Sequence, residues 1–179
     1  MTSGATFGDH RYSAQKKAYK HLSGYRQVHP SFRWLWASSY QNKHKVFWLL
    51  LHDRLSTREI LRRKSMNLPS YNCVLCNQGC EESLEHLFLR CRFAKDWWAS
   101  IGLSTPQQLN PEQTIEHFKS SLGVPFFVEI IVIMSWSIWK SRNSLIFEGM
   151  QASITSCRLL FCKEFALVIL RAKDSYSPS

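Results

Sequence analysis

The chain has 179 residues, of which 45% are hydrophobic and 13% aromatic, so its composition excludes a disordered protein and fits one domain or a small module with an extension. Its formal net charge of +10 favours nucleic acid or another polyanion as a partner, although a charge spread over the surface for solubility is the plainer alternative. The first residues lack the apolar segment of a secretory signal, so we expect a soluble intracellular protein whose cysteines are thiols or metal ligands.

The first part of the chain is predicted to be helical after a disordered start. Residues 1–10 are small and polar and are expected to lack order. A short basic helix is expected over residues 12–22, and the aromatic segment 32–36 is expected to pack into the core. Apolar residues at helical spacing then predict a helix over residues 43–51.

A second helix is expected to begin at Ser56, which fits a capping box with Glu59. A row of positively charged side chains on a helix most often marks only the side of the helix that faces solvent. As a group, however, the cations here are the predicted contacts for nucleic-acid phosphates, independent of sequence and sensitive to salt. We call these residues the basic patch, and they are Arg58, Arg62, Arg63 and Lys64.

The next stretch is rich in residues that bind metals. Cys73 and Cys76 form a C-x2-C pair, and after nine further residues His86 and Cys91 form H-x4-C. Zn²⁺ prefers four tetrahedral nitrogen and sulfur ligands, and four protein ligands leave no open position for water or substrate. We therefore predict a structural zinc site, not a hydrolytic one, whose ligands are Cys73, Cys76, His86 and Cys91.

Four alternatives to this ligand set stay open, and one of them is a chance clustering in a chain with six cysteines. The C-x2-C pair could be a redox pair, although that interpretation leaves His86 and Cys91 unexplained and lacks a surrounding βαβ pattern. Cys80, in the loop between the two halves, could replace one of the ligands. His86 could also be an ordinary buried histidine, since it lies between Leu84 and Leu87.

The spacing of the last two ligands also makes a structural prediction. Cys91 follows His86 by five residues, whereas the side chains of an α-helix share a face after three or four. We therefore expect the helix to loosen near Arg90 so that both ligands converge. Trp97 and Trp98 are expected in a following helix that packs the module onto the rest of the chain.

The motif and its flanks resemble a known family. The run from Cys73 to Cys91 resembles the zinc-binding domain at the C-terminal end of plant non-LTR (LINE-type) retrotransposon reverse transcriptases. Residues 45–61 and 136–147 are similar to the segments "KVxxFxW…RLxT…L" and "IWxxRNxxxF" that flank this domain. The resemblance implies zinc binding and the handling of RNA or target DNA beside a polymerase. The extra Cys80 departs from the pattern.

The rest of the chain is also predicted to be helical. A capping box at Asn110 and Gln113 predicts a helix that runs to about Leu122. One long helix is expected over residues 126–147 and a last amphipathic helix over residues 153–173.

Three smaller predictions concern the same half of the chain. The apolar run over residues 125–139 is shorter than the ~18–20 residues that span a bilayer, so it is expected to be a buried core helix. Cys157 and Cys162 are expected to be small apolar fillers and not ligands. Residues 175–179 are expected to form a disordered tail.

The predicted fold is thus mainly α-helical. A small helical domain built around a structural zinc knuckle is expected over residues 11–100, and a helical C-terminal extension over residues 101–174. No internal repeat and no sustained strand-like alternation is present in the sequence.

The residues do not favour an enzyme. A polymerase or nuclease holds Mg²⁺ with clustered carboxylates, but the four aspartates are scattered at positions 9, 53, 96 and 174. We expect a free-standing, non-catalytic module that binds RNA or DNA, with no membrane and no small-molecule substrate. Two alternatives remain: a zinc-stabilised protein-interaction module, and a decayed retroelement fragment without nucleic-acid binding.

Overall fold

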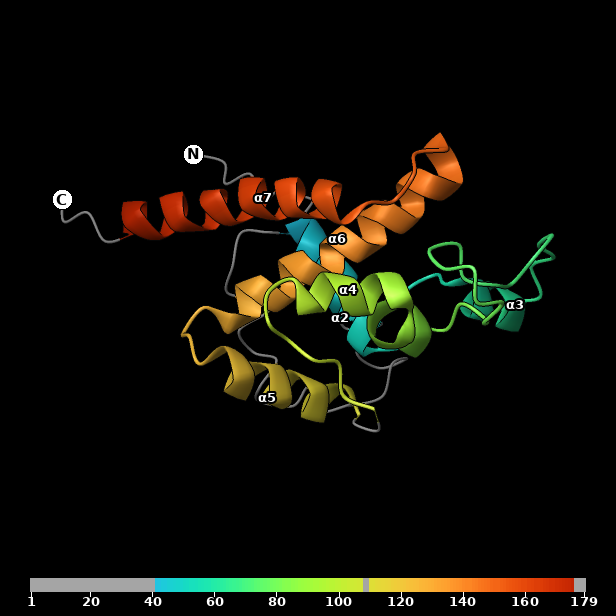
Figure 1. The fold of residues 1–179 in the computed structure, drawn as a ribbon, viewed down its shortest axis with the longest axis horizontal. Coiled ribbons are helices and arrows are strands. Elements are labelled where there is room, and N and C mark those ends of the chain that lie inside the picture. Colours follow the sequence, from blue (N-terminus) through green and yellow to red (C-terminus); the bar gives the residue numbers. More distant parts are fainter. Residues whose placement is uncertain (1–40, 108–109, 176–179) are drawn as a thin grey trace, which may run out of the picture. The chain divides into compact units, whose positions relative to one another are not determined.

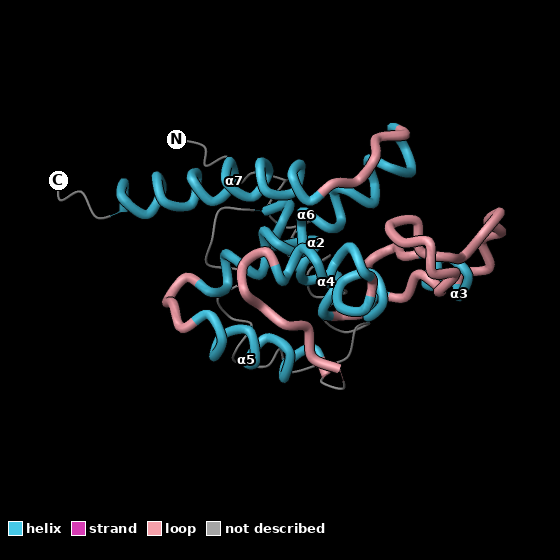
Figure 2. Tube along the Cα trace, viewed as in Figure 1, coloured by secondary structure: helices cyan, strands magenta, loops and turns pink. Residues whose placement is uncertain are grey.

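The computed structural model describes residues 41–107 and 110–175, which belong to one compact unit. Every named element in these ranges is a helix, and the segment between α3 and the π-helix η2 is a loop (Figures 1 and 2). The mainly α-helical class is therefore confirmed. In chain order the elements are α2 (Gln41–Leu51), α3 (Arg58–Arg63), η2 (His86–Arg90), α4 (Arg92–Ala99), α5 (Pro111–Leu122), α6 (Phe127–Glu148) and α7 (Ile154–Ser175).

Some predictions lie outside the described residues. These are the disordered start over residues 1–10, the basic helix over residues 12–22, the aromatic segment 32–36 and nearly all of the tail over residues 175–179.

Helix α6 lies at the centre of this unit. Residues 128–138 are buried with only two interruptions, because the helix is apolar on all sides and such a helix must be covered all round. Helices α2, α4, α5, α7 and η2 all pack against it, and Figure 1 shows α6 between α5 and α7. The predictions of a buried core helix over residues 125–139 and of a long helix over residues 126–147 are confirmed.

A helix that spans a membrane must be both long enough and apolar enough. None of the described helices meets both requirements alone. Helices α5 and α6 meet them only when taken together, as a pair bent by 117°.

The ends of α5 follow the sequence signals. The backbone N–H of Gln113 donates to Asn110 Oδ1 at 2.8 Å, and the Gln113 side chain accepts from the Asn110 backbone N–H at 3.1 Å. Gly123 ends the helix in the left-handed conformation, with φ of 61°, which glycine adopts without strain. The predicted capping box and helix are confirmed.

The start of α3 differs from the prediction. Thr57, not Ser56, is the N-cap, and its side chain accepts from the backbone N–H of Ile60 at 3.5 Å. The carboxylate of Glu82 accepts from the N–H of Arg58 at 3.1 Å, so a residue from another segment caps the same helix end. The predicted capping box of Ser56 and Glu59 is therefore wrong.

The two cysteines of α7 differ in burial. Cys157 is 1% exposed, and its sulfur lies 3.2 Å from the hydroxyl of Ser141 on α6. Burial raises the pKa of this thiol. Cys162 is exposed, so the prediction of a buried filler is correct for Cys157 and wrong for Cys162, which lies on the outer face of the helix.

Candidate metal centre

The first two predicted ligands, Cys73 and Cys76, lie on a closed loop. Asn72 and Glu81 form an isolated antiparallel bridge, and the backbone N–H of Cys73 donates to the carbonyl of Cys80 at 2.8 Å. These pairings bring the two ends of the loop together and fix its direction. We call residues 71–82 the ligand loop, and we call its paired segments, residues 71–73 and 80–82, the stem of this loop.

The other two predicted ligands, His86 and Cys91, bracket the short π-helix η2. The backbone N–H of Cys91 donates to the carbonyl of His86 at 2.6 Å, which is the five-residue hydrogen bond of a π-turn. Because a π-turn holds one more residue than an α-turn, residues five apart come to the same side. The predicted loosening near Arg90 is confirmed.

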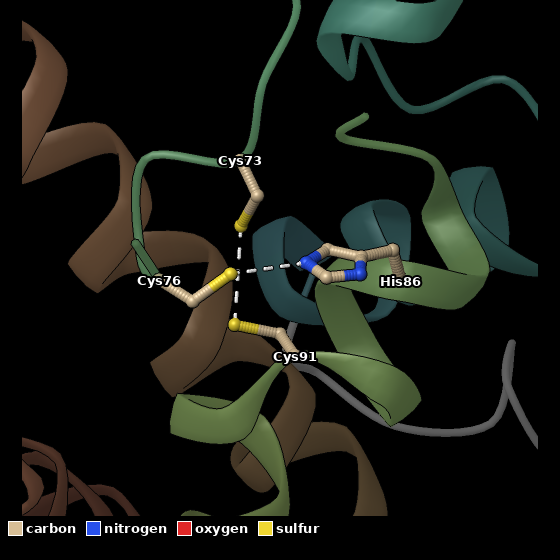
Figure 3. Close-up of side chains that lie close together, drawn as sticks. All are labelled: Cys73, Cys76, His86 and Cys91. Carbon is tan, nitrogen blue, oxygen red and sulfur yellow. Dashed lines mark hydrogen bonds between the residues drawn. The ribbon is translucent and has the colours of Figure 1, made fainter. Parts of the chain in front are cut away.

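The two ligand pairs face one another (Figure 3). We call Cys73 and Cys76 the first ligand pair and His86 and Cys91 the second. One sulfur or imidazole nitrogen atom from each residue lies within 4.8 Å of the others. The sulfurs of Cys73 and Cys91 are 3.9 Å apart, and Cys76 Sγ lies 3.3 Å from His86 Nε2.

These distances fit a tetrahedral zinc ion. With Zn–S near 2.3 Å and Zn–N near 2.0–2.1 Å, the ligand atoms of such an ion lie about 3.5–3.8 Å apart. Cys73, His86 and Cys91 are buried and Cys76 is half-buried. The residues therefore fit Zn²⁺, which would link the ligand loop to η2 as a structural ion.

Cys80 lies outside this cluster. It is exposed, and its sulfur faces the carbonyl of Gln78 at 3.7 Å. The imidazole of His86, by contrast, lies inside the cluster. The geometry therefore favours the four named ligands over the alternatives with Cys80 as a ligand or with His86 as an ordinary core residue.

The three clustered thiols differ in acidity. The contact with the Cys73 thiol lowers the pKa of Cys91 to about 6, and the backbone N–H groups at the start of α4 act in the same direction. That contact and burial raise the pKa of Cys73, and burial raises the pKa of Cys76. Cys91 is therefore the most acidic of the three thiols.

The residues of the basic patch lie on α3 and just beyond it, and they differ in their contacts. Arg58 is half-buried, and its guanidinium donates to the carbonyl of Asn72 in the stem at 2.9 Å. Arg62, Arg63 and Lys64 are exposed.

Two of the exposed arginines form ion pairs within the protein. Arg62 pairs with Glu81 at 2.8 Å, and Arg63 pairs with Asp53 at 2.9 Å. A hydrogen bond from Arg63 to Asp53 raises the pKa of Arg63. For Lys64 no ion pair occurs among residues 41–107 and 110–175.

Sequence reasoning missed two residues next to the site. Glu82 and Arg142 form a buried ion pair at 2.8 Å, with side chains 0% and 5% exposed. Glu82 is not among the predicted site residues, and Arg142 is singled out by the sequence only as part of the segment 136–147. A buried glutamate and a buried arginine nearly always need a partner, but the sequence does not reveal which one.

Comparison with known proteins gives one match. Residues 12–98 match the family model described as zinc-binding in reverse transcriptase, and this range contains all four clustered residues. No curated protein and no solved structure matches the chain significantly. The matched family is a zinc-binding accessory domain and not a catalytic one. Residues 12–98, just under half of the chain, are therefore similar to the zinc-binding domains of reverse transcriptases.

Proposed function

We propose that this protein binds nucleic acid non-catalytically, through a basic surface beside the zinc site. The observation that carries the proposal is the succession of three exposed cations, Arg62, Arg63 and Lys64, at the end of α3 in a chain of net charge +10. Cations on a rigid surface attract the phosphate backbone of RNA or DNA whatever its sequence.

The ion pairs of Arg62 and Arg63 do not prevent such contacts. Their side chains are 54% and 49% exposed, and ion pairs this exposed contribute little to stability. A phosphate can therefore replace a carboxylate partner at little cost. Lys64 adds a third charge. Arg58 has a different role, because it holds the stem of the ligand loop.

The proposal is tested by fluorescence anisotropy with labelled single-stranded RNA and DNA at two salt concentrations. Three phosphate contacts to a single strand would make the affinity fall roughly 20-fold between about 50 and 200 mM salt. The double variant Arg62→Gln/Lys64→Gln should bind more weakly and depend less on salt. The matched control is Lys140→Gln/Lys163→Gln, which removes the same charge from exposed positions on α6 and α7.

Two results would contradict the proposal. One is an affinity that does not change between the two salt concentrations. The other is an equal loss of binding in both double variants, because the attraction would then come from the total charge and not from the end of α3.

A second candidate function is protein interaction, and the outer face of α7 favours it. Leu159, Ile169 and Leu170 are 69%, 47% and 57% exposed, and large exposed apolar side chains often mark an interaction surface. The exposed residues Leu159, Cys162, Ala166 and Ile169 also follow the three–four–three spacing of a two-stranded coiled coil. The occupant that this spacing fits is a second copy of the chain.

Light scattering over a range of protein concentrations tests this candidate. A self-associating α7 predicts a dimer that Leu159→Glu returns to a monomer. A protein that stays monomeric at all concentrations would remove the candidate.

A further inference from the structure

The carboxylate of Glu82 is buried at the stem of the ligand loop. Its side chain is 0% exposed, and the residue lies in sequence between the first and second ligand pairs. Its Oε1 accepts a hydrogen bond from the backbone N–H of Arg58 at 3.1 Å and another from Arg142 Nη2 at 2.8 Å. One carboxylate therefore joins the stem, the start of α3 and the central helix α6.

Arg142 reaches this carboxylate across 60 positions of sequence. Its Nε also donates to Glu82, at 3.2 Å to Oε1 and 3.4 Å to Oε2. Its Nη1 donates to Asn143 Oδ1 at 2.9 Å, and the guanidinium carbon lies 4.9 Å from the centre of the Trp139 ring. The planar guanidinium is thus held on several sides, and its Nε and Nη2 donors both point at Glu82.

A buried ion pair of this kind fixes the orientation of the segments that it joins more than it stabilises the fold. Removing two charges from water offsets their attraction, so a buried ion pair is often no more stable than two apolar side chains of similar volume. Here three N–H groups, one from Arg58 and two from Arg142, point at the same oxygen of Glu82. They fix the orientation of the stem from which the first ligand pair extends.

The second ligand pair is attached to α6 by a different contact. Helix α4 follows Cys91 directly, and the indole N–H of Trp97 on α4 donates to the carbonyl of Met134 on α6 at 3.2 Å. Both ligand pairs are therefore fixed to one helix, the first through Arg142 and the second through Trp97.

We propose that Glu82 and Arg142 are positioning residues for the zinc centre, with α6 as the common frame. Their ion pair sets the direction from which the first ligand pair meets the second, and in this way it sets the affinity for the metal. Helix α6 lies outside residues 12–98, so a part of the chain that the family model does not match would tune the metal site. The inference concerns the zinc site alone and does not depend on nucleic-acid binding.

The test uses the full chain and two sets of substitutions. Arg142→Met removes the charge and keeps much of the volume, whereas Glu82→Leu/Arg142→Met replaces the whole pair by apolar side chains. Arg158→Met is the matched control, because it makes the same change at an exposed position on α7. Zn²⁺ affinity is measured by competition with a chelator, and the absorption spectrum of the Co²⁺-loaded protein reports the ligand geometry.

Arg142→Met should weaken zinc binding about 10- to 100-fold and alter the Co²⁺ spectrum, as changes to groups that orient metal ligands typically do. The apolar double variant should recover the thermal midpoint that the native protein has in excess chelator, but not the zinc affinity or the Co²⁺ spectrum of the native protein. Native affinity and spectrum in Arg142→Met would overturn the proposal. Recovery of affinity together with thermal midpoint in the double variant would also overturn it, because the pair would then be merely structural. If Arg142→Met does not fold, the double variant tests the proposal alone, and native zinc affinity in that variant would overturn it.

Discussion

The indole N–H of Trp98 donates a hydrogen bond to the backbone carbonyl of Phe88 at 2.8 Å. Phe88 lies within the π-helix η2, and the chain leaves the helical conformation at Cys91, where ψ is 135°. A helix end of this kind leaves carbonyl groups that need a donor from elsewhere. Trp98 is 1% exposed, so it supplies that donor inside the core and holds the segment that carries the second ligand pair.

Trp98→Phe should destabilise the protein by about 2–4 kcal/mol, because it leaves the Phe88 carbonyl without its donor and opens a small cavity. Denaturant unfolding measures the loss. Trp136→Phe is the control, since Trp136 is only half-buried on α6 and no hydrogen bond of its indole occurs in the described part of the chain. A loss no larger than in this control would contradict the role assigned to Trp98.

Loss of a zinc ligand should unfold the central module. Zinc binding at such sites contributes about 10–16 kcal/mol in finger peptides, which is comparable to the total stability of a domain. Cys73→Ser and His86→Ala are therefore expected to lower the thermal midpoint strongly and to expose residues 71–91 to proteases. Cys80→Ser makes the same chemical change outside the cluster and should behave like the native protein. Equal thermal midpoints of Cys73→Ser and Cys80→Ser would refute the assignment of Cys73 as a zinc ligand.

Zinc affinity should fall as the pH falls from 8 to 6. The pKa of Cys73 is raised by its contact with Cys91 and by burial, and burial raises the pKa of Cys76, so both thiols must lose protons when the metal binds. Two released protons correspond to a loss of roughly 100-fold in affinity per pH unit. Cys91, with a pKa of about 6, adds a third proton only near and below that pH. Competition with a chelator of known protonation measures the slope, and an affinity independent of pH would contradict this account.

The cap of α5 should contribute to stability independently of the metal. Asn110→Ala removes the acceptor of the Gln113 N–H and should cost about 1 kcal/mol of unfolding free energy. Asn110→Ser keeps a capping oxygen and should cost much less. The difference between the two variants should persist when zinc is removed with a chelator, because α5 carries none of the ligands. Two variants of equal stability would show that the cap has no such role.

The features that were predicted correctly depend on local sequence. The capping box of Asn110 and Gln113, the end of α5 near Leu122 and the loosened turn between His86 and Cys91 all follow from residues within a few positions of one another. The four clustered residues could be identified because metal ligands of a small knuckle lie close together in sequence.

The features that were missed depend on contacts between distant segments. Thr57 caps α3 in place of Ser56 beside a carboxylate from residue 82, which no local signal reveals. The partner of that carboxylate lies 60 residues further along. Likewise, the hydrogen bond from Arg58 to the carbonyl of Asn72 joins residues 14 positions apart, and no local signal reveals it.

The central claim is that one zinc ion joins the ligand loop to the π-helix through three sulfurs and one imidazole. Elemental analysis of purified, folded protein tests it most directly. The account predicts close to one zinc per chain in the native protein and in Cys80→Ser, and a large loss of zinc in Cys73→Ser. Correctly folded native protein without stoichiometric metal would contradict it.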